Sequence, residues 1–466
     1  MTYLIIFLAL FAAIGHRIAR SIRQQNSRIP IVPSTLPWFG NFFEFRRDPV
    51  HFMQSCRQKY GPVYKILLAG QKIIVLSHQK GITLLNKDSA RCFTSTPIHR
   101  RVLTTIGGVN ANQEHLLDVM DTKLYPPLMK SLSPASMVPM ADNIHQNLQR
   151  ELREIGHITK APLLLRLDEL ISRPLYRAGC LTLFGPTFPL DTFDDFHLFD
   201  SKFSQLILGL PFVAQDATLA CQRLATSFAA YLVPLWSEES TEGVSEIIAA
   251  SIQEMRGLVT LQEAARLLML FVVGFHSNTS SMIFWLLSHI LQQDLSGRLR
   301  QELHAAQTTE VNTPLMSSAI TEVLRWATTN TTVRVATKHT SIMVDGEPIP
   351  IRKGESVIAD VQSLHYDPAI YSNPDEFMVD RFLESDSGVS IPKPLAFGGG
   401  AHLCPGRHLA QVEIKHFLST LLQMYEIKAV IKEGTKPKLP MVDKRDLVGT
   451  LRTNEAFYVA VWPVDT

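Results

Sequence analysis

The longest apolar run with helical periodicity in this chain covers residues 259–292, VTLQEAARLLMLFVVGFHSNTSSMIFWLLSHILQ. A helix of about 30 residues is roughly 45 Å long, so it crosses the full width of a domain. From about residue 112 to 310 the pattern is mostly helical, and we predict breaks at prolines, among them Pro126, Pro127, Pro174 and Pro211. Two further helices are expected at MSSAITEVLRWATT and at CPGRHLAQVEIKHFLSTLLQMY, the second starting just past Cys404.

Strand patterns are fewer and shorter than the helical ones. Residues 60–78, YGPVYKILLAGQKIIVLSH, alternate apolar and polar side chains about a central Ala69-Gly70, which predicts a hairpin. Residues 333–361 are rich in valine and contain the turn pair Asp345-Gly346, so they predict short strands joined by a tight turn. No internal repeat, low-complexity segment or Ser/Gly linker divides the body. We therefore expect a mainly α fold with a minor β-sheet component, as one large domain over residues 41–466.

The amino terminus has the composition of a membrane anchor. It begins with an uncharged apolar run of 15 residues, MTYLIIFLALFAAIG, and basic residues follow the run. A spanning helix normally needs about 20 apolar residues, although snorkelling arginines relax that length. A cleaved signal peptide carries its charge before the apolar run, so we prefer a single-pass transmembrane anchor over residues 1–16. Residues 17–40 are basic and proline-rich and predict a semi-rigid linker, and the charge distribution leaves the following body in the cytoplasm.

Charge and cysteine content exclude several classes of protein. The formal net charge is +2, which is too small to indicate binding to nucleic acid. The five cysteines are odd in number and far apart, and no CxxC pair occurs among them. Neither a disulfide framework nor a zinc module is therefore indicated, and a reducing environment is the simplest interpretation.

The segment FGGGAHLCPGR, residues 397–407, places one cysteine in a loop of small residues. Cys404 stands immediately before a predicted helix, where backbone N–H groups and the helix dipole favour a thiolate and lower the thiol pKa. Residues 398–400 and Gly406 lack a Cβ, so the backbone there can approach a flat partner closely. A buried structural cysteine or a catalytic nucleophile would also fit a Gly-rich turn, but neither accounts for the spacing of the loop.

That spacing, Phe397, Gly400, Cys404 and Gly406, resembles the haem-binding loop of the cytochrome P450 family. The resemblance implies that Cys404 is the axial ligand of the iron of haem b, since this family holds haem iron by a cysteine thiolate. It also implies the cytochrome P450 fold and extends over nearly the whole chain.

Two further segments are similar to family motifs. Glu322 and Arg325, in TEVLRW, match an E-x-x-R pair, and Arg381, in NPDEFMVDRF, matches the arginine that joins this pair in a three-residue network. The usual Pro-Glu before that arginine is Val-Asp here. A carboxylate can accept from two guanidinium groups at once, so such a network fixes the geometry of the segments that it joins.

The resemblance also implies cationic side chains for the haem propionates. His402 and Arg334 occupy positions at which the family commonly places them. Many relatives use in addition a tryptophan and an arginine on a helix in the amino-terminal half. This chain has no tryptophan in the corresponding stretch, and His115 and Lys123 are candidate substitutes.

The long helix carries GFHSNTSS where the family commonly has a small residue, glycine, an acid and threonine. Thr279 matches the threonine, and its hydroxyl can bond to the carbonyl four residues earlier and open the helix. Asn278 stands at the position of the acid and cannot titrate, so it does not donate protons as a carboxylic acid would. Both are also explained as ordinary polar residues that face a neighbouring helix.

Together these motifs resemble the branch with sterol 7-alpha- and 12-alpha-hydroxylases and prostacyclin synthase. The resemblance implies a monooxygenase that uses O2 and electrons from NADPH, passed by NADPH-cytochrome P450 reductase, to hydroxylate or otherwise oxidise a lipophilic molecule. A sterol, terpenoid or polyketide fits as the substrate, and the resemblance implies a biosynthetic role at the endoplasmic reticulum.

Two alternatives to the monooxygenase remain. The first is an isomerase or dehydratase that works without NADPH on a peroxide or activated substrate, and Asn278 favours it. The second is a non-catalytic haem sensor. Thr279 favours the monooxygenase.

Overall fold

The computed structural model describes residues 29–34, 36–87, 89–105, 108, 112–156, 162–208, 214–237, 243–305, 313–329, 331–384, 391–400, 403–431, 435–444 and 449–464. The predicted anchor, the first part of the linker and His402 lie outside these residues. Contacts divide the chain into two compact units. The first comprises the residues up to Ser95, Thr329–Ser372 and Gly398–Leu403, and the second comprises Thr96–Thr328, Asn373–Phe397 and Cys404–Thr466. That the catalytic body is one domain stays a prediction.

The first unit contains most of the strands. Its helices are α2 (Phe42–Arg47), α3 (Pro49–Tyr60), α4 (Gln79–Lys87), α5 (Ser89–Cys92) and α18 (Val361–His365). Its strands are β1 (Val63–Leu68), β2 (Gln71–Leu76), β3 (Phe93–Thr94), β5 (Thr331–Ala336), β6 (Thr340–Val344), β7 (Glu347–Ile351) and β8 (Ser356–Asp360).

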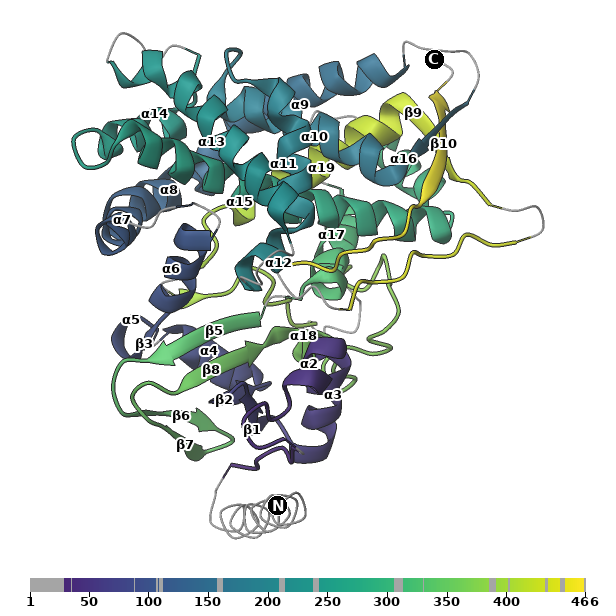
Figure 1. Cartoon of the computed structure of the whole chain (residues 1–466). Helices are drawn as coiled ribbons and strands as arrows, with labels where there is room; N and C mark the ends of the chain where they lie inside the picture. The colour runs from purple at the N-terminus through teal and green to yellow at the C-terminus, as the bar shows by residue number, and fades with distance from the viewer. Residues whose placement is uncertain are drawn as a thin grey trace, which may run out of the picture. The chain divides into compact units, whose positions relative to one another are not determined.

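The main sheet of this unit has the order β1-β2-β8-β5-β3, and Figure 1 shows β2, β8 and β5 side by side. The predicted hairpin is confirmed: β1 and β2 pair antiparallel around Ala69 and Gly70, whose φ angles are 47° and 82°. The predicted turn is confirmed as well, since Asp345 and Gly346 have φ angles of 51° and 84° between β6 and β7. Positive φ at both central residues suits the twist of a hairpin.

The described part of the predicted linker does not form a spacer. The N–H of Lys65, in β1, donates to the carbonyl of Pro30 over 2.8 Å, and the carbonyl of Lys65 accepts from Val32 over 2.8 Å. Ile29 and Val32 are buried. Proline lacks an N–H but keeps its carbonyl, so a proline-rich segment can still add to a sheet edge. This segment therefore belongs to the first unit.

The second unit is mainly helical, as predicted. Its strands are β4 (Leu163–Arg166), β9 (Tyr425–Ala429) and β10 (Tyr458–Pro463), which form a sheet of order β4-β10-β9. Its helices are α6 (Thr96–Thr105), α7 (Gln113–Val119), the π-helix η1 (Met120–Leu124), α8 (Tyr125–Ser131), α9 (Pro134–Gly156), α10 (Leu167–Phe184), the 3₁₀-helix η2 (Leu190–Thr192), α11 (Phe193–Ser201), α12 (Phe203–Leu208), α13 (Gln215–Trp236), α14 (Glu246–Met255), α15 (Leu261–Gln292), α16 (Ser296–Ala305), α17 (Pro314–Ala327) and α19 (Arg407–Met424).

The long helix predicted over 259–292 is confirmed as α15. It begins at a capping box, in which the Thr260 hydroxyl accepts from the N–H of Glu263 and the Glu263 carboxylate accepts from the N–H of Thr260. Within the described part of the chain, α15 alone has the length and hydropathy of a membrane span, yet 61% of its apolar window is buried inside the protein. Trp285 is fully buried, so α15 is a core helix.

The prediction of a break at Pro174 is wrong. Pro174 lies inside α10 and is buried there, and the helix continues to Phe184. A proline inside a helix removes one backbone hydrogen bond, and packing on both sides of the helix compensates for that loss. Pro126 and Pro127 do mark a change of helix type, because they lie in the first turn of α8, directly after η1. Pro211 lies outside the described residues.

Candidate functional site

The cysteine loop leads directly into α19, as predicted. The N–H of Cys404 donates to the carbonyl of Phe397 over 3.0 Å, which closes the loop between these two motif positions. The Arg407 side chain donates to the Cys404 carbonyl over 3.1 Å. Gly406 precedes the helix, and a Cβ added there would lie 3.9 Å from the Cys404 sulfur. Cys404 is therefore a half-buried thiol with its sulfur at the start of a helix.

The pKa of the Cys404 thiol differs from the expectation. Burial raises it above the ordinary value, while the backbone N–H groups of Gly406 and Arg407 and the charge of Arg407 act in the opposite direction. The prediction of a lowered pKa is wrong in its net direction, because desolvation of the thiolate outweighs the helix terminus. Coordination to a metal ion removes a thiol proton outright, so the backbone donors here would serve a bound thiolate.

One of the three glycines before Cys404 is required by a contact within the first unit. Within the first unit, a Cβ added to Gly400 would lie 1.9 Å from the carbonyl oxygen of Asn86, at the end of α4. Gly398 and Gly400 both have positive φ angles, 70° and 61°. Only a residue without a Cβ therefore fits beside the backbone of α4 at position 400, and the predicted close approach of these glycines to a flat partner stays a prediction.

The predicted network of one carboxylate and two arginines is present. Arg325 donates to both oxygens of Glu322 over 2.8 Å each. Arg381 donates through Nε to the same carboxylate over 3.0 Å. Glu322 and Arg325 are fully buried and Arg381 is nearly so. Three buried charges that satisfy one another form a rigid unit.

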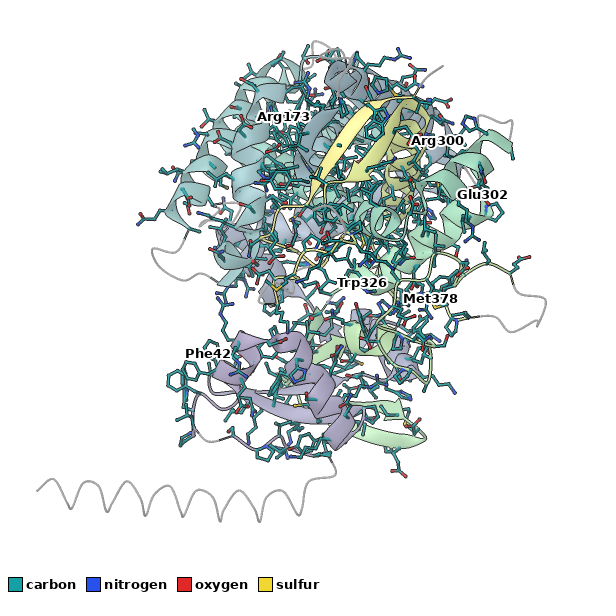
Figure 2. The ribbon with its side chains drawn as sticks, turned by 90° about the vertical axis from the view of Figure 1, so that its right-hand side faces the viewer. Phe42, Arg173, Arg300, Glu302, Trp326 and Met378 are labelled. Atoms are coloured by element: carbon teal, nitrogen blue, oxygen red, sulfur yellow. The ribbon has the colours of Figure 1, made fainter. Side chains whose placement is uncertain are left out.

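This network also holds the segment 373–382 against α17. The N–H of Met378 donates to Glu322 over 3.0 Å, and Arg325 donates to the carbonyl of Pro374 over 2.8 Å. The indole N–H of Trp326 donates to the carbonyl of Asp375 over 3.2 Å. Figure 2 labels Trp326 and Met378 on the two segments that the network joins.

Thr279 behaves as its motif predicts. Its hydroxyl donates to the carbonyl of Phe275, one turn earlier on α15, over 2.8 Å, and the side chain is buried. Asn278 is exposed, and so is Gly274 one turn before it, although most of α15 around them is buried. A Cβ added to Gly274 would meet nothing within 4 Å. The middle of α15 therefore presents an open face at these two positions.

Asn278 contacts the turn before the last strand. The Thr450 hydroxyl lies 3.5 Å from the Asn278 side-chain oxygen, and Gly449 approaches the same amide. On the neighbouring position of α15, Ser277 accepts a hydrogen bond of 2.5 Å from Arg452, which also pairs with Asp200 over 3.0 Å. Polar side chains from α11, α15 and residues 449–452 thus lie together.

Arg334 lies in the first unit, on β5, and its environment is unusual for a cation. The side chain is buried, and its one hydrogen bond within the described residues is from Nη1 to the carbonyl of Val333 over 3.1 Å. The Nε atom is buried, and no acceptor for it lies in the part of the chain that the structure describes. Burial alone lowers the pKa of this guanidinium. A buried guanidinium whose hydrogen-bond donors are not all paired favours the binding of an anion.

Neither candidate for the missing tryptophan contact shows a special environment. His115 is exposed, and one of its ring nitrogens lies 2.7 Å from the carbonyl of Leu258. Lys123 is exposed on η1. No role for either residue follows from these contacts.

Sequence reasoning missed Glu413, which is buried on α19. Burial raises its pKa to about 8, and a hydrogen bond with Thr279 acts in the opposite direction. The spacing of apolar residues in the sequence could have indicated this burial. A period of four places Glu413 between Leu409 and Phe417, on the apolar face of the helix. An acid on that face is placed toward the core.

Comparison with known proteins identifies the family. The cytochrome P450 family profile matches residues 30–455 of this chain. The chain belongs to the cytochrome P450 family. It is a cytochrome P450 monooxygenase, with the mainly helical fold and minor sheets of that family, and the prediction from the cysteine loop is confirmed.

Several curated cytochromes P450 are similar to this one over most of their length. It is 24% identical to cytochrome P450 7A1 of Oryctolagus cuniculus, over 90% of both chains. It is 25% identical to cholesterol 7-alpha-monooxygenase of Cricetulus griseus, again over 90% of both chains. It is 23% identical to 7-alpha-hydroxycholest-4-en-3-one 12-alpha-hydroxylase of Oryctolagus cuniculus, over 91% of both.

The fold is similar to that of a solved cytochrome P450. The retinoic acid bound cyanobacterial CYP120A1 matches with a TM-score of 0.73 and 21% identity, over 94% of this chain and 100% of that one. This likeness concerns the fold alone.

Haem-thiolate chemistry is what the P450 family implies, and the residues present fit haem. The Cys404 sulfur, beside the start of α19, can be a single thiolate ligand to iron. Taken by itself within the first unit, the buried Arg334 has an Nε–H without an acceptor among the described residues, which suits an anionic group such as a carboxylate. The open face of α15 at Gly274 and Asn278 leaves room for a bound group. His402 lies outside the described residues, so its propionate contact stays a prediction.

Proposed function

We propose that this cytochrome P450 hydroxylates, or otherwise oxidises, a lipophilic small molecule such as a sterol, terpenoid or polyketide in a biosynthetic pathway. The observation that carries the oxygen-using reaction is the Thr279 hydroxyl, bonded to the Phe275 carbonyl over 2.8 Å beside the open face of α15. The lipophilic class is supported by relatives whose names state cholesterol or 7-alpha-hydroxycholest-4-en-3-one. A sterol is the first class to test.

The residues of the site have distinct tasks in this proposal. Cys404 binds the iron of haem b, and Phe397, Gly400 and Gly406 shape the loop that holds the cysteine. Arg334 and His402 neutralise the propionates. Haem supplies the oxygen chemistry, while the protein supplies binding, orientation and protons. Glu322, Arg325 and Arg381 hold the segment 373–382 in place through the hydrogen bonds described above.

Substitution of Cys404 by serine tests the haem-binding part of the proposal. The wild-type protein, reduced and exposed to carbon monoxide, should give the red-shifted absorption band typical of thiolate ligation. C404S should lose that band, while C180S, which changes a buried thiol at a different place, should keep it. An unchanged band in C404S would contradict the role of Cys404.

Electrons from NADPH, passed by NADPH-cytochrome P450 reductase, are part of the proposal. The test is to incubate the protein with a sterol mixture and the reductase, with and without NADPH, and to compare product masses. A product that gains one oxygen atom only with NADPH supports the monooxygenase reaction. Without any such product the proposed reaction fails for that substrate class.

Asn278 favours a second candidate, an isomerase or dehydratase acting on a peroxide or similarly activated substrate. Its amide replaces the acid that delivers protons in many relatives, and a rearrangement needs no such delivery. In that case a product of the same mass, or a product that has lost water, forms without NADPH. The same mass comparison therefore separates the two candidates.

We also propose a single-pass membrane attachment at the endoplasmic reticulum with the catalytic body in the cytoplasm. The apolar run at the amino terminus supports it. A cluster of aromatic rings in the first unit supports it as well. Trp38 is 59% exposed and Phe43 is 55% exposed. The ring centroid of Phe39 lies 5.0 Å from that of Trp38 and 5.2 Å from that of Phe43. Exposed tryptophan and phenylalanine suit the interface of a bilayer. Flotation with liposomes, compared between wild type and W38A/F43A, tests the contribution of the cluster.

A further inference from the structure

A cavity of about 420 Å³ lies in the second unit, between the end of α9, the strand β4 and the first half of α10. The described residues that line it include none of the residues of the haem site. Cavities that bind small molecules have volumes of about 300–1,000 Å³, with mostly apolar walls and a few polar groups. This cavity therefore has the size of a second binding site.

The cavity has an apolar floor that β4 and α10 provide. Side chains alternate between the two faces of a strand, so Leu163 and Leu165 of β4 both lie at the cavity, whereas Leu164 points to the other face and is 61% exposed. From α10 come Leu170 and Pro174, which are buried and lie one turn apart. A hydrocarbon group placed against these side chains would be removed from water.

Glu151, on α9, brings a carboxylate to the cavity with one oxygen unused. Its side chain is only 7% exposed, and the Nε of Arg177 donates to its Oε2 atom. Among the described residues this is the one hydrogen bond of the carboxylate, so its Oε1 atom has no donor. A buried carboxylate is stable only when donors satisfy its oxygens. A donor placed in the cavity would complete the environment of Glu151.

Two further carboxylates at the cavity lack a cation of their own. Glu154 follows Glu151 by three residues and so lies on the same face of α9. Within the described part of the chain no ion pair engages Glu154. Glu169 is 61% exposed, and the nearest guanidinium, that of Arg166, is 3.9 Å away and donates instead to Asp168 over 2.7 and 3.0 Å.

The two arginines at the cavity already have carboxylate partners. Arg177 binds Glu151, as described above. Arg173, labelled in Figure 2, donates to Asp194 over 2.7 Å, and its guanidinium lies 4.5 Å from the centre of the Phe193 ring. Three glutamates and two arginines line the cavity, and one of the arginines pairs with an acid outside it. The remaining negative charge favours a cation as the ligand.

We propose that this cavity binds a lipophilic primary amine in its ammonium form. The hydrocarbon part lies on Leu163 and Leu165, and the ammonium group donates to the unused oxygen of Glu151. A primary ammonium group has three N–H donors, so it can serve Glu151 and also lie between the carboxylates of Glu154 and Glu169. An alcohol lacks the charge and a carboxylic acid has the opposite one, so both bind less tightly.

Ligand-observed NMR of the full chain tests the choice of ligand. The probes are n-hexylammonium, n-hexanol and n-hexanoate, which share one chain length and differ in charge. The reduced protein is first saturated with carbon monoxide, because an amine could otherwise bind the haem iron. The wild-type protein should bind n-hexylammonium about 10-fold or more tightly than n-hexanoate, as expected for one charge-assisted hydrogen bond. Absent binding of n-hexylammonium, or binding of n-hexanoate that is equally tight, would overturn the proposal.

Two changes on one strand test the place of binding. L163W fills the cavity with a larger side chain and should weaken the binding of n-hexylammonium by about 10-fold or more. L164W is the matched control, since it makes the same change on the opposite, exposed face of β4 and should bind like the wild type. Binding that is equally tight in L163W and L164W would show that the amine lies elsewhere.

A charge variant tests the role of the carboxylates without changing the shape of the cavity. Glu154 and Glu169 are both exposed, so E154Q/E169Q should fold like the wild type. The preference for n-hexylammonium over n-hexanol should fall by about 2- to 30-fold, the equivalent of two exposed ion pairs. This comparison is independent of whether L163W folds. An unchanged preference in E154Q/E169Q would contradict the recognition of a cation by these carboxylates.

Discussion

A Cβ added to Gly449 would lie 2.2 Å from the side-chain oxygen of Asn278. Gly449 also has a φ of +81°, which a residue with a side chain adopts at a cost. The turn at Gly449 therefore restricts where the Asn278 amide lies.

From this contact we expect G449A to destabilise the protein by about 1–3 kcal/mol through crowding, beyond the cost of its backbone angle. G257A is the matched control: Gly257 has a similar φ of +74°, but a Cβ there would meet nothing within 4 Å. Thermal unfolding of both variants checks the difference. When N278A is combined with G449A, most of the additional loss of stability relative to G257A should disappear. Equal losses of stability in G449A and G257A would contradict the predicted crowding.

The Glu322 network should be essential for stability. E322Q leaves two buried guanidinium groups facing a neutral amide, so we expect a loss of about 3–5 kcal/mol. The exposed pair Arg223–Asp195 provides the comparison, since its side chains are 56% and 28% exposed and D195N should cost less than about 1 kcal/mol. Urea unfolding measures both. An E322Q variant as stable as D195N would show that the network contributes little.

We expect Arg334 to strengthen haem binding and, in the haem-free protein, to lower the stability of the fold. R334M removes a buried cation whose Nε lacks an acceptor among the described residues, so the haem-free protein should unfold at the same temperature or a higher one. Its affinity for haem should fall by about 10- to 150-fold, the equivalent of one charge-assisted hydrogen bond. Haem titration and calorimetry test the two effects separately. Unchanged haem affinity in R334M would exclude the propionate role.

Acid should destabilise the fold partly through His289. Its ring stacks on Phe377 and meets Trp326 edge to face, and neither ring nitrogen has a hydrogen-bond partner among the described residues. Burial lowers its pKa to about 3. The unfolded chain binds this proton near pH 6.5. Between about pH 6.5 and 3, therefore, stability falls as the pH falls, by about 1.4 kcal/mol per pH unit from this group.

H289L should weaken the fall in stability with falling pH. H339L changes an exposed histidine and should leave the fall in stability as it is in the wild type. Unfolding in urea at a series of pH values below neutral supplies the measurement. His276 and His416 also have pKa values lowered by burial to about 4, so part of the acid sensitivity should remain in H289L. Parallel profiles for wild type and H289L would show that His289 is not responsible.

The sequence predicted what depends on neighbours along the chain. The helical period over 259–292, the turn pairs at residues 69–70 and 345–346, and the start of a helix just after Cys404 are local patterns, and all are confirmed. The three charged residues of the network could also be found, because their spacing matches a family motif.

What the sequence did not predict depends on packing. The direction of the Cys404 pKa shift, the continuation of α10 through Pro174 and the contact that requires Gly400 are set by surroundings distant in sequence. Glu413 belongs to the same group, since its burial follows from the packing of α19 against α9 and α15. A period-four apolar pattern places it on the inner face of α19, but only the packed structure shows that no cation among the described residues affects its pKa.

The main sheet of the first unit pairs two strands, β2 and β8, that the ribosome makes at widely separated times. β2 pairs with β8 in parallel, Ile73 opposite Ser356, so most of the second unit lies between them in sequence. At about 5–20 residues per second, a ribosome needs roughly 15 to 60 s to pass from one strand to the other. Throughout that interval β2 has an unpaired edge, which is prone to association with other chains. Newly made β2 must therefore be kept apart from other nascent chains until translation has released β8.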